Sequence, residues 1–311
     1  MGHKKWSSFS VSSSNHLRHN FTNLNYGPDT FALLGNHDWG IWSHGGDEGS
    51  RYKLNLALNQ IRACYDRSER SSGWNMPYRY YHFTTEYAEF YCIDSTSYYY
   101  DAQQQAWLAQ VFQKQQLAHP EKWQILVSHH PLLAIGKRNL VNGKKDWSLY
   151  EQFFHPGKKT GKISYNEVLY SQLKDYPFDI IISAHDHALA GYVFELNDQR
   201  RAFQLVSGAG GAKLEKMHKY TSCYGQLQRE HDLQIKVVGE DHGSGDQHGY
   251  VSMNIAADNV DLIYRWVNGR EANTSIYKHF CRSPSRLRGS SMSEEEIGLE
   301  YRDRNHSLSL P

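Results

Sequence analysis

The sequence lacks a dominant charge, a dense cysteine framework and a long apolar run. Lys and Arg total 34 against 33 Asp and Glu, so the formal net charge of the 311 residues is only +1. A balance this even gives no electrostatic basis for binding nucleic acid. No apolar run approaches the roughly 18 residues that a transmembrane helix needs. We therefore expect neither a nucleic-acid partner nor a membrane partner.

Cysteine is scarce, and its spacing indicates neither a zinc ribbon nor a redox motif. The four cysteines, Cys64, Cys92, Cys223 and Cys281, form no C-x-x-C pair. Cys92 lies inside an apolar run and is expected to be a small core residue. The other three leave open whether the chain forms a disulfide. The first 21 residues are rich in Ser, His and Lys and lack the apolar stretch of a signal peptide.

The distribution of apolar residues predicts one layered α/β domain. Apolar strands are expected at 30–34, 90–93, 123–127 and 178–183, and they alternate with amphipathic helices. Asp101 can cap one of these helices, whose apolar face is formed by Trp107, Leu108, Val111 and Phe112. Two antiparallel strands with a turn at Asp258 and Asn259 follow later. The predicted boundaries are an irregular segment over residues 1–28, a domain over 29–281 and a disordered tail over 282–311.

Three of the predicted strands end in side chains that can bind a metal. Asn36-His37-Asp38 follows the first strand, His129-His130 a later one, and His185-Asp186-His187 another. Neighbouring strands of an α/β sheet deliver their loops to one edge, so residues distant in sequence can meet there. Imidazole nitrogens and an amide oxygen suit Zn²⁺, Mn²⁺ or iron. A shared metal site therefore explains the three endings better than three unrelated loop histidines.

Other polar residues near these strand ends are expected to have supporting roles. His130 beside His129 is interpreted as structural rather than as a ligand. Asp38 and Asp186 are interpreted as orienting or capping carboxylates. The glycine-rich stretch 208–211 could approach a phosphate, but a tight turn is the favoured interpretation.

The order of these motifs resembles the calcineurin-like metallophosphoesterases, and within them the small purple acid phosphatases of the tartrate-resistant type. The segments that carry the resemblance are "LLGNHDWG", "WNMPYRYY", "FYCIDS", "QQQAWLAQ", "LVSHHPLL", "AHDH" and "LVSGAGG". The resemblance covers residues 30–269 and implies an α/β/β/α sandwich with two mixed sheets. It also implies secretion or a lysosomal or periplasmic location, whereas the sequence itself leaves the location unknown.

The resemblance implies a phosphatase that hydrolyses phosphate monoesters with two metal ions. By position, Asn36, His129 and His185 would bind one metal and His187 the other, with iron beside zinc, manganese or a second iron. In the family a metal-bound hydroxide attacks phosphorus in line, and His37 would protonate the leaving alkoxide or steady the phosphoryl oxygens. The substrate would be a small phosphomonoester or a phosphoprotein, and the oligomeric state is not indicated.

The chain departs from the family at its start. The family places D-x-G or D-x-H and G-D-x-x-Y before the G-N-H-D motif, and neither occurs here. Asp29 is the only carboxylate before Asn36, and it lies at the wrong end of its strand to be a ligand. One metal would keep three protein ligands, whereas the second would keep only His187. The first strand–helix unit of the fold is accordingly expected to be missing, and the chain to be an N-terminally incomplete member.

Three hypotheses follow from these observations. The first is an acid phosphatase, supported by the three strand endings. The second is a catalytically weak or inactive remnant that acts as a binding module, supported by the missing carboxylates. The third is a phosphodiesterase or nucleotide hydrolase of the same superfamily, which a comparison of rates on a monoester and a diester would distinguish. The Trp74 and Tyr78–Tyr81 segment favours the acid phosphatase over the diesterase.

Overall fold

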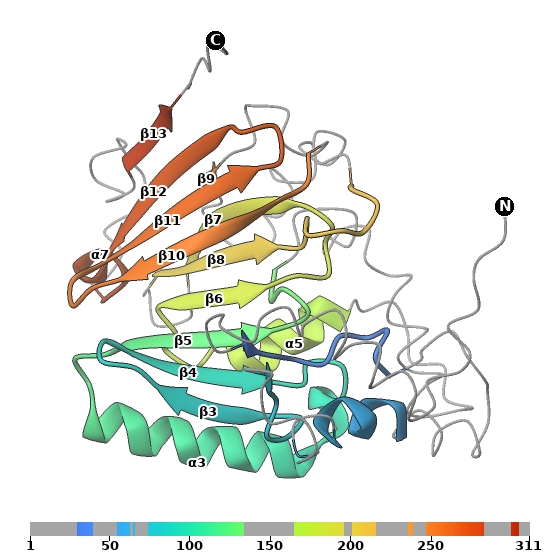
Figure 1. Cartoon of the computed structure of the whole chain (residues 1–311). Coiled ribbons are helices and arrows are strands. Elements are labelled where there is room, and N and C mark those ends of the chain that lie inside the picture. The colour runs from blue at the N-terminus through green and yellow to red at the C-terminus, as the bar shows by residue number, and fades with distance from the viewer. Residues whose placement is uncertain are drawn as a thin grey trace, which may run out of the picture.

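The fold is built around one mixed sheet that carries helices on one face and a second sheet on the other (Figure 1). The computed structural model describes residues 30–39, 55–62, 65, 74–133, 165–195, 201–215, 236–238, 247–282 and 300–304. Among these residues, no helix combines the length and apolar character that crossing a membrane requires.

The large sheet has seven strands, in the order β3-β4-β5-β6-β8-β7-β9. Their bounds are β3 Tyr81–Thr84, β4 Ala88–Ile93, β5 Trp123–Ser128, β6 Ile180–Ser183, β7 Leu189–Glu195, β8 Arg201–Ser207 and β9 Lys236–Val238. The four strands β4, β5, β6 and β8 run parallel to one another. Their carboxyl ends therefore share one edge of the sheet, as the sequence predicts.

The second sheet and the helices complete the layers. The sheet comprises β10 Gly249–Ile255, β11 Asn259–Trp266, β12 Glu271–Tyr277 and β13 Glu300–Arg304. The helices are α3 Ala102–Ala118, α5 Tyr165–Leu173, α7 Lys278–Arg282 and the 3₁₀-helix η3 Tyr98–Tyr100. Residues 55–62 are also helical. A short parallel pair joins β1 Thr30–Phe31 to β2 Trp74–Asn75.

Alternation along the central strands divides their side chains between two cores. In β4, Tyr91 and Ile93 pack against α3 and α5, whereas Ala88 faces the second sheet. In β5, Leu126 belongs to the helix side, and Trp123 and Ile125 belong to the sheet side. Both faces of these strands are buried, which explains why the sequence shows continuous apolar runs rather than alternation.

Helix α3 begins where the sequence predicts it. The carboxylate of Asp101 accepts a hydrogen bond from the backbone N–H of Gln104 at 3.0 Å, which satisfies one of the unpaired donors of the first turn. Leu108 and Phe112 are buried against the sheet. The cap and the apolar face together fix the start of the helix at the carboxyl end of β4.

One detail of the predicted fold needs correction. The layered α/β fold is confirmed, but the second sheet is antiparallel in every described pair, where a mixed sheet was expected. Its strands β10 and β11 are joined by a short hairpin loop, which permits only antiparallel pairing. The five residues of strand β13 lie within 282–311, the segment predicted to be a disordered tail, and that domain boundary stays a prediction. They pair with β12 through backbone groups, for which apolar periodicity is not required.

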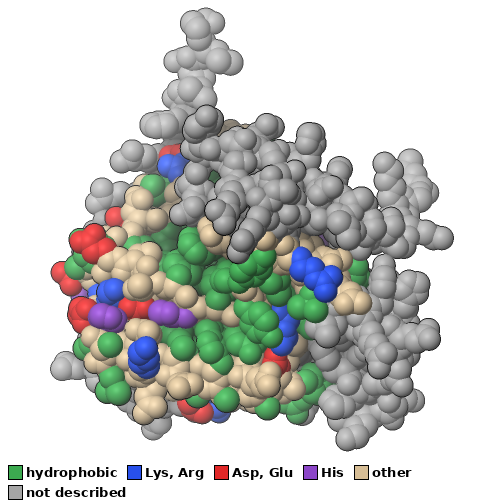
Figure 2. Space-filling view, turned by 60° about the horizontal axis from the view of Figure 1, so that its bottom comes forward, with side chains coloured by type: hydrophobic (Ala, Val, Ile, Leu, Met, Phe, Trp, Pro, Cys, Tyr) green, Lys and Arg blue, Asp and Glu red, His purple; other side chains and the backbone are tan. Residues whose placement is uncertain are grey.

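One face of the molecule displays hydrophobic side chains across its middle, with charged groups at its margins (Figure 2). Several large aromatic and aliphatic side chains are more than a third exposed, among them Phe31, Tyr78 and Tyr99. Phe31 stacks on Phe83 of β3 with 4.1 Å between the ring centroids, and Phe83 stacks on Phe90 of β4 at 4.6 Å. Strand β3 lies at one end of the strand order of the large sheet.

Candidate metal centre

Three of the predicted metal ligands meet at the carboxyl edge of the large sheet. The Oδ1 atom of Asn36 lies 2.8 Å from Nε2 of His129. The Nδ1 atom of His185 lies 3.0 Å from the same Nε2. His129 follows β5 directly and His185 follows β6 after one residue, so the parallel pairing of these two strands brings their imidazoles together.

The donor atoms of this cluster fit a single metal ion. An amide oxygen and two neutral imidazole nitrogens form a common set for Zn²⁺, Mn²⁺ or iron. The spacings of 2.8 and 3.0 Å are slightly shorter than those between neighbouring ligands of a bound cation, so only a small expansion is needed. Histidines bind a metal through a ring nitrogen that carries no proton, so protonation of these imidazoles in acid competes with metal binding.

The loop that carries His185 has a strained backbone. His185 has a φ of 60°, in the left-handed region, and among the described residues no other non-glycine has a positive φ. Such conformations concentrate at functional sites, where the surrounding structure enforces them. Here the backbone N–H of Ala184 donates to the carbonyl of His129 at 3.0 Å, and that of Asp186 donates to the carbonyl of Ala184 at 2.7 Å. The first bond joins the two histidine loops, and the second lies within the loop that carries His185.

The glycine after β8 allows this loop to approach closely. A Cβ on Gly208 would lie only 1.9 Å from the carbonyl oxygen of Asp186. The N–H of Gly208 donates to the carbonyl of Ala188 at 2.9 Å. Gly210 and Gly211 have no neighbours within 4 Å of an added Cβ. The close approach at Gly208 is therefore to the chain's own backbone, and Asp186, predicted as an orienting residue, is buried within the same loop.

The turn of residues 36–39 presents Asn36 and His37 in succession. The carboxylate of Asp38 accepts a hydrogen bond from the N–H of Gly35 at 2.7 Å, and the Asp38 N–H donates to the Gly35 carbonyl at 3.1 Å. This bracing agrees with an orienting role for Asp38. Burial raises the pKa of the Asp38 carboxyl to about 6; the Gly35 bond lowers it, and the nearby Asp94 raises it further. Asn36 is buried, whereas His37, the predicted acid, is exposed.

His187 projects from the same loop as His185 and is only half-buried. Its Nδ1 lies 2.8 Å from the carbonyl oxygen of Lys213. A carbonyl can only accept, so Nδ1 carries the proton and Nε2 keeps its lone pair. A backbone carbonyl commonly fixes a metal-binding histidine in this way. Ligation by His187 remains a prediction.

His130 lies closer to the cluster than the sequence suggested. One ring nitrogen from each of His129, His130 and His185 lies within 4.8 Å of the others, and among the described residues this is the one group of its kind. His130 is fully buried, its Nδ1 lies 2.9 Å from Oγ of Ser95, and its ring centroid is 4.2 Å from that of His185. The predicted structural role is compatible with these contacts, because His130 packs beneath the two candidate ligands.

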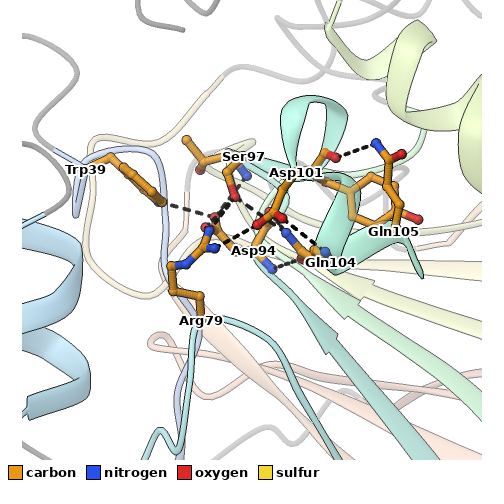
Figure 3. A network of polar contacts seen from close by, with 9 residues as sticks. Trp39, Arg79, Asp94, Ser97, Asp101, Gln104 and Gln105 are labelled. Atoms are coloured by element: carbon orange, nitrogen blue, oxygen red, sulfur yellow. Dashed lines mark hydrogen bonds and ion pairs between the residues drawn. The ribbon is translucent and has the colours of Figure 1, made fainter. Parts of the chain in front are cut away.

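Sequence reasoning missed a polar network beside the site (Figure 3). The carboxylate of Asp94, directly after β4, accepts hydrogen bonds from Trp39 and Arg79. The register pairs Ile93 with Ser128, which places Asp94 next to His129 at the carboxyl edge. The signal was present in "FYCIDS", where a fourth apolar strand ends in a carboxylate.

Comparisons with known proteins identify the family of the chain. The family model for calcineurin-like phosphoesterases matches residues 10–189, more than half of the chain. The match spans all three strand endings, and the chain therefore belongs to the calcineurin-like phosphoesterases. This confirms the family predicted from the motifs.

Among solved structures, a similar one is a purple acid phosphatase, PPD1, from seeds of yellow lupin (Lupinus luteus). It is 14% identical, and the alignment covers 61% of this chain and 31% of that protein, with a TM-score of 0.38. The chain thus matches about a third of the length of that phosphatase. A search of curated proteins found no match.

Proposed function

We propose that the chain is a metal-dependent acid phosphatase that hydrolyses phosphate monoesters. The observation that carries the proposal is that Nε2 of His129 lies 2.8 Å from Oδ1 of Asn36 and 3.0 Å from Nδ1 of His185. Three protein ligands with an open position are the usual composition of a catalytic metal site. A bound metal ion would supply Lewis acidity toward a phosphoryl oxygen and would lower the pKa of water.

Each of the three polar residues in the turn 36–39 has a different role in the proposed reaction. Asn36 contributes the amide oxygen to the metal site. His37 is its immediate neighbour and lies at the protein surface, where its imidazole donates a proton to the departing alkoxide. Asp38 closes the turn through its bond to Gly35 and thereby keeps Asn36 and His37 in fixed relation.

The family resemblance supports iron with zinc, manganese or a second iron as the cofactor. Among the described residues, His187 is the remaining candidate ligand on the histidine loop, with its Nδ1 bonded to Lys213. We propose that the first metal binds tightly through Asn36, His129 and His185, and that a second, if bound through His187, is weaker. A small phosphomonoester or a phosphoprotein is the proposed substrate.

Hydrolysis of p-nitrophenyl phosphate tests this function. The chain is loaded with Mn²⁺, Zn²⁺ or iron and compared with a His129→Ala, His185→Ala double variant, for which we expect background rates. A matched control is His119→Ala, because His119 is a partly exposed histidine after α3, near the start of β5 rather than its carboxyl end. A wild-type rate no higher than that of the double variant would contradict catalysis.

The second candidate function, a metal-binding module without turnover, is favoured by the single histidine group among the described residues. It predicts that the wild type binds one metal ion per chain and hydrolyses neither a monoester nor a diester. Metal content measured by mass spectrometry, set beside the rates, separates the two functions. Two tightly held ions per chain would exclude the module.

A further inference from the structure

A buried carboxylate, that of Asp94, lies next to the candidate metal centre. Its described hydrogen bonds go to residues other than the predicted metal ligands. Asp94 is 0% exposed and follows β4 directly. Its Oδ1 accepts a hydrogen bond from the indole N–H of Trp39 at 3.2 Å, and its Oδ2 accepts one from Ser97 Oγ at 2.7 Å. Its Oδ2 also lies 3.2 Å from Nη1 of Arg79 (Figure 3).

The guanidinium of Arg79 compensates the buried charge and fixes its position. A buried carboxylate is costly unless it is paired and hydrogen-bonded, and Asp94 has both kinds of partner. Arg79 also bonds Asp101 at 2.7 Å through Nη2, and its side chain is only 13% exposed. Since Asp101 caps α3, Arg79 joins the end of β4 to the start of that helix. Asp94 is therefore held as a rigid acceptor.

Trp39 connects this acceptor to the metal-binding turn. It is the last residue of the turn 36–39, is 5% exposed, and packs with Leu34, Ala57 and Ile61. The bonds between Gly35 and Asp38 shape the turn locally, but they do not determine where it lies relative to the sheet. The indole contact ties the far end of the turn to the carboxyl end of β4, whereas the bond from the Tyr81 hydroxyl to the Ala32 carbonyl holds the segment before the turn.

We propose that Asp94 and Arg79 are positioning residues for the metal centre, acting through Trp39. They hold the turn so that Oδ1 of Asn36 stays within 2.8 Å of His129 Nε2. This inference rests on the proposed metal site. It extends that site to the polar network around Asp94, which contains none of the predicted metal ligands. Second-layer partners of this kind orient ligands, and their loss weakens metal binding.

The test is the affinity of the full chain for Zn²⁺, measured by isothermal titration calorimetry. Trp39→Phe removes the N–H donor and keeps an aromatic ring in the core. We expect the dissociation constant to rise about 10- to 100-fold, with the chain still folded by circular dichroism.

The matched control is Trp123→Phe. Its indole N–H donates to the carbonyl of Ala256 at 2.8 Å, and Trp123 lies at the start of β5, away from the carboxyl edge. This variant also loses one indole hydrogen bond, so a comparable loss of stability is expected. Its Zn²⁺ affinity should equal that of the wild type, because no contact of Trp123 reaches the turn. If the loss of an indole hydrogen bond affected Zn²⁺ binding only through stability, the Zn²⁺ affinity of both variants would fall alike.

A double-mutant cycle tests the coupling to Asp94. Asp94→Ala should weaken Zn²⁺ binding at least as much as Trp39→Phe, and the double variant should lose little more, because both changes break the same contact. If Asp94→Ala fails to fold, Trp39→Phe alone decides. Wild-type affinity in Trp39→Phe, or additive losses in the cycle, would overturn the positioning role alone. A wild type that binds no Zn²⁺ would overturn the proposed metal site and the positioning role together.

Discussion

Gly35 is the residue whose substitution tests the position of His129 most sharply. A Cβ at Gly35 would lie 3.0 Å from Cε1 and 3.1 Å from Nδ1 of the His129 ring. These contacts are tighter than van der Waals contact allows, so in Gly35→Ala the ring must retreat by a few tenths of an ångström. Ligand distances at metal sites tolerate about 0.2 Å. The retreat is as large as this tolerance, so we expect it to weaken ligation by Nε2.

We expect Gly35→Ala to weaken Zn²⁺ binding about tenfold, which corresponds to about 1.4 kcal/mol. The free energy of unfolding without metal should change by less than about 1 kcal/mol, because alanine restricts the unfolded chain and offsets part of the contact strain. Calorimetric titration measures the first quantity and urea unfolding of the metal-free protein the second.

The matched control for this prediction is Gly210→Ala. Gly210 lies in the glycine-rich stretch after β8, and an added Cβ there has no neighbour within 4 Å. The Zn²⁺ affinity of the Gly210→Ala variant should equal that of the wild type. Unchanged binding by Gly35→Ala would refute the reasoning, since it would mean that the His129 ring either is not packed on Gly35 or is not a ligand.

Three further predictions concern stability. Gly208→Ala should lower the free energy of unfolding by about 3 kcal/mol, because its Cβ would overlap the Asp186 carbonyl; urea unfolding that matches the wild type would contradict the contact. Burial lowers the pKa of His82, a shift that its bond to Glu89 at 2.7 Å partly offsets. The contribution of His82 to the free energy of unfolding is therefore present above about pH 6.5, and it is lost as the pH falls through the lowered pKa of His82. Urea titrations should show His82→Gln losing less stability than the wild type on acidification, and equal losses would refute this. Chelation should lower the melting temperature of the metal-loaded wild type and leave that of His129→Ala unchanged; equal shifts in both would place the metal elsewhere.

Much of the site was predictable because its signal is local. Apolar runs that end in His129 and His185 mark buried parallel strands, and such strands share a carboxyl edge. The capping role of Asp101 was predictable for the same reason, since the cap and the first turn of α3 adjoin in sequence. The structure brings Asn36, His129 and His185 together, whereas their binding of a metal remains a prediction.

The features that sequence reasoning missed depend on contacts between distant residues. The Trp39–Asp94 bond joins residues 55 positions apart, and no periodicity indicates which indole faces which carboxylate. Arg79 is one charged residue among many in the sequence until the fold places it between Asp94 and Asp101. Strand β13 was missed because edge pairing uses backbone groups, which every sequence carries.

The most direct test of the account is a crystal structure of the metal-loaded chain with anomalous scattering from the bound ion. The account predicts one strong peak about 2.0–2.2 Å from Asn36 Oδ1, His129 Nε2 and His185 Nδ1. A peak away from these three atoms, or none at saturating metal, would contradict it.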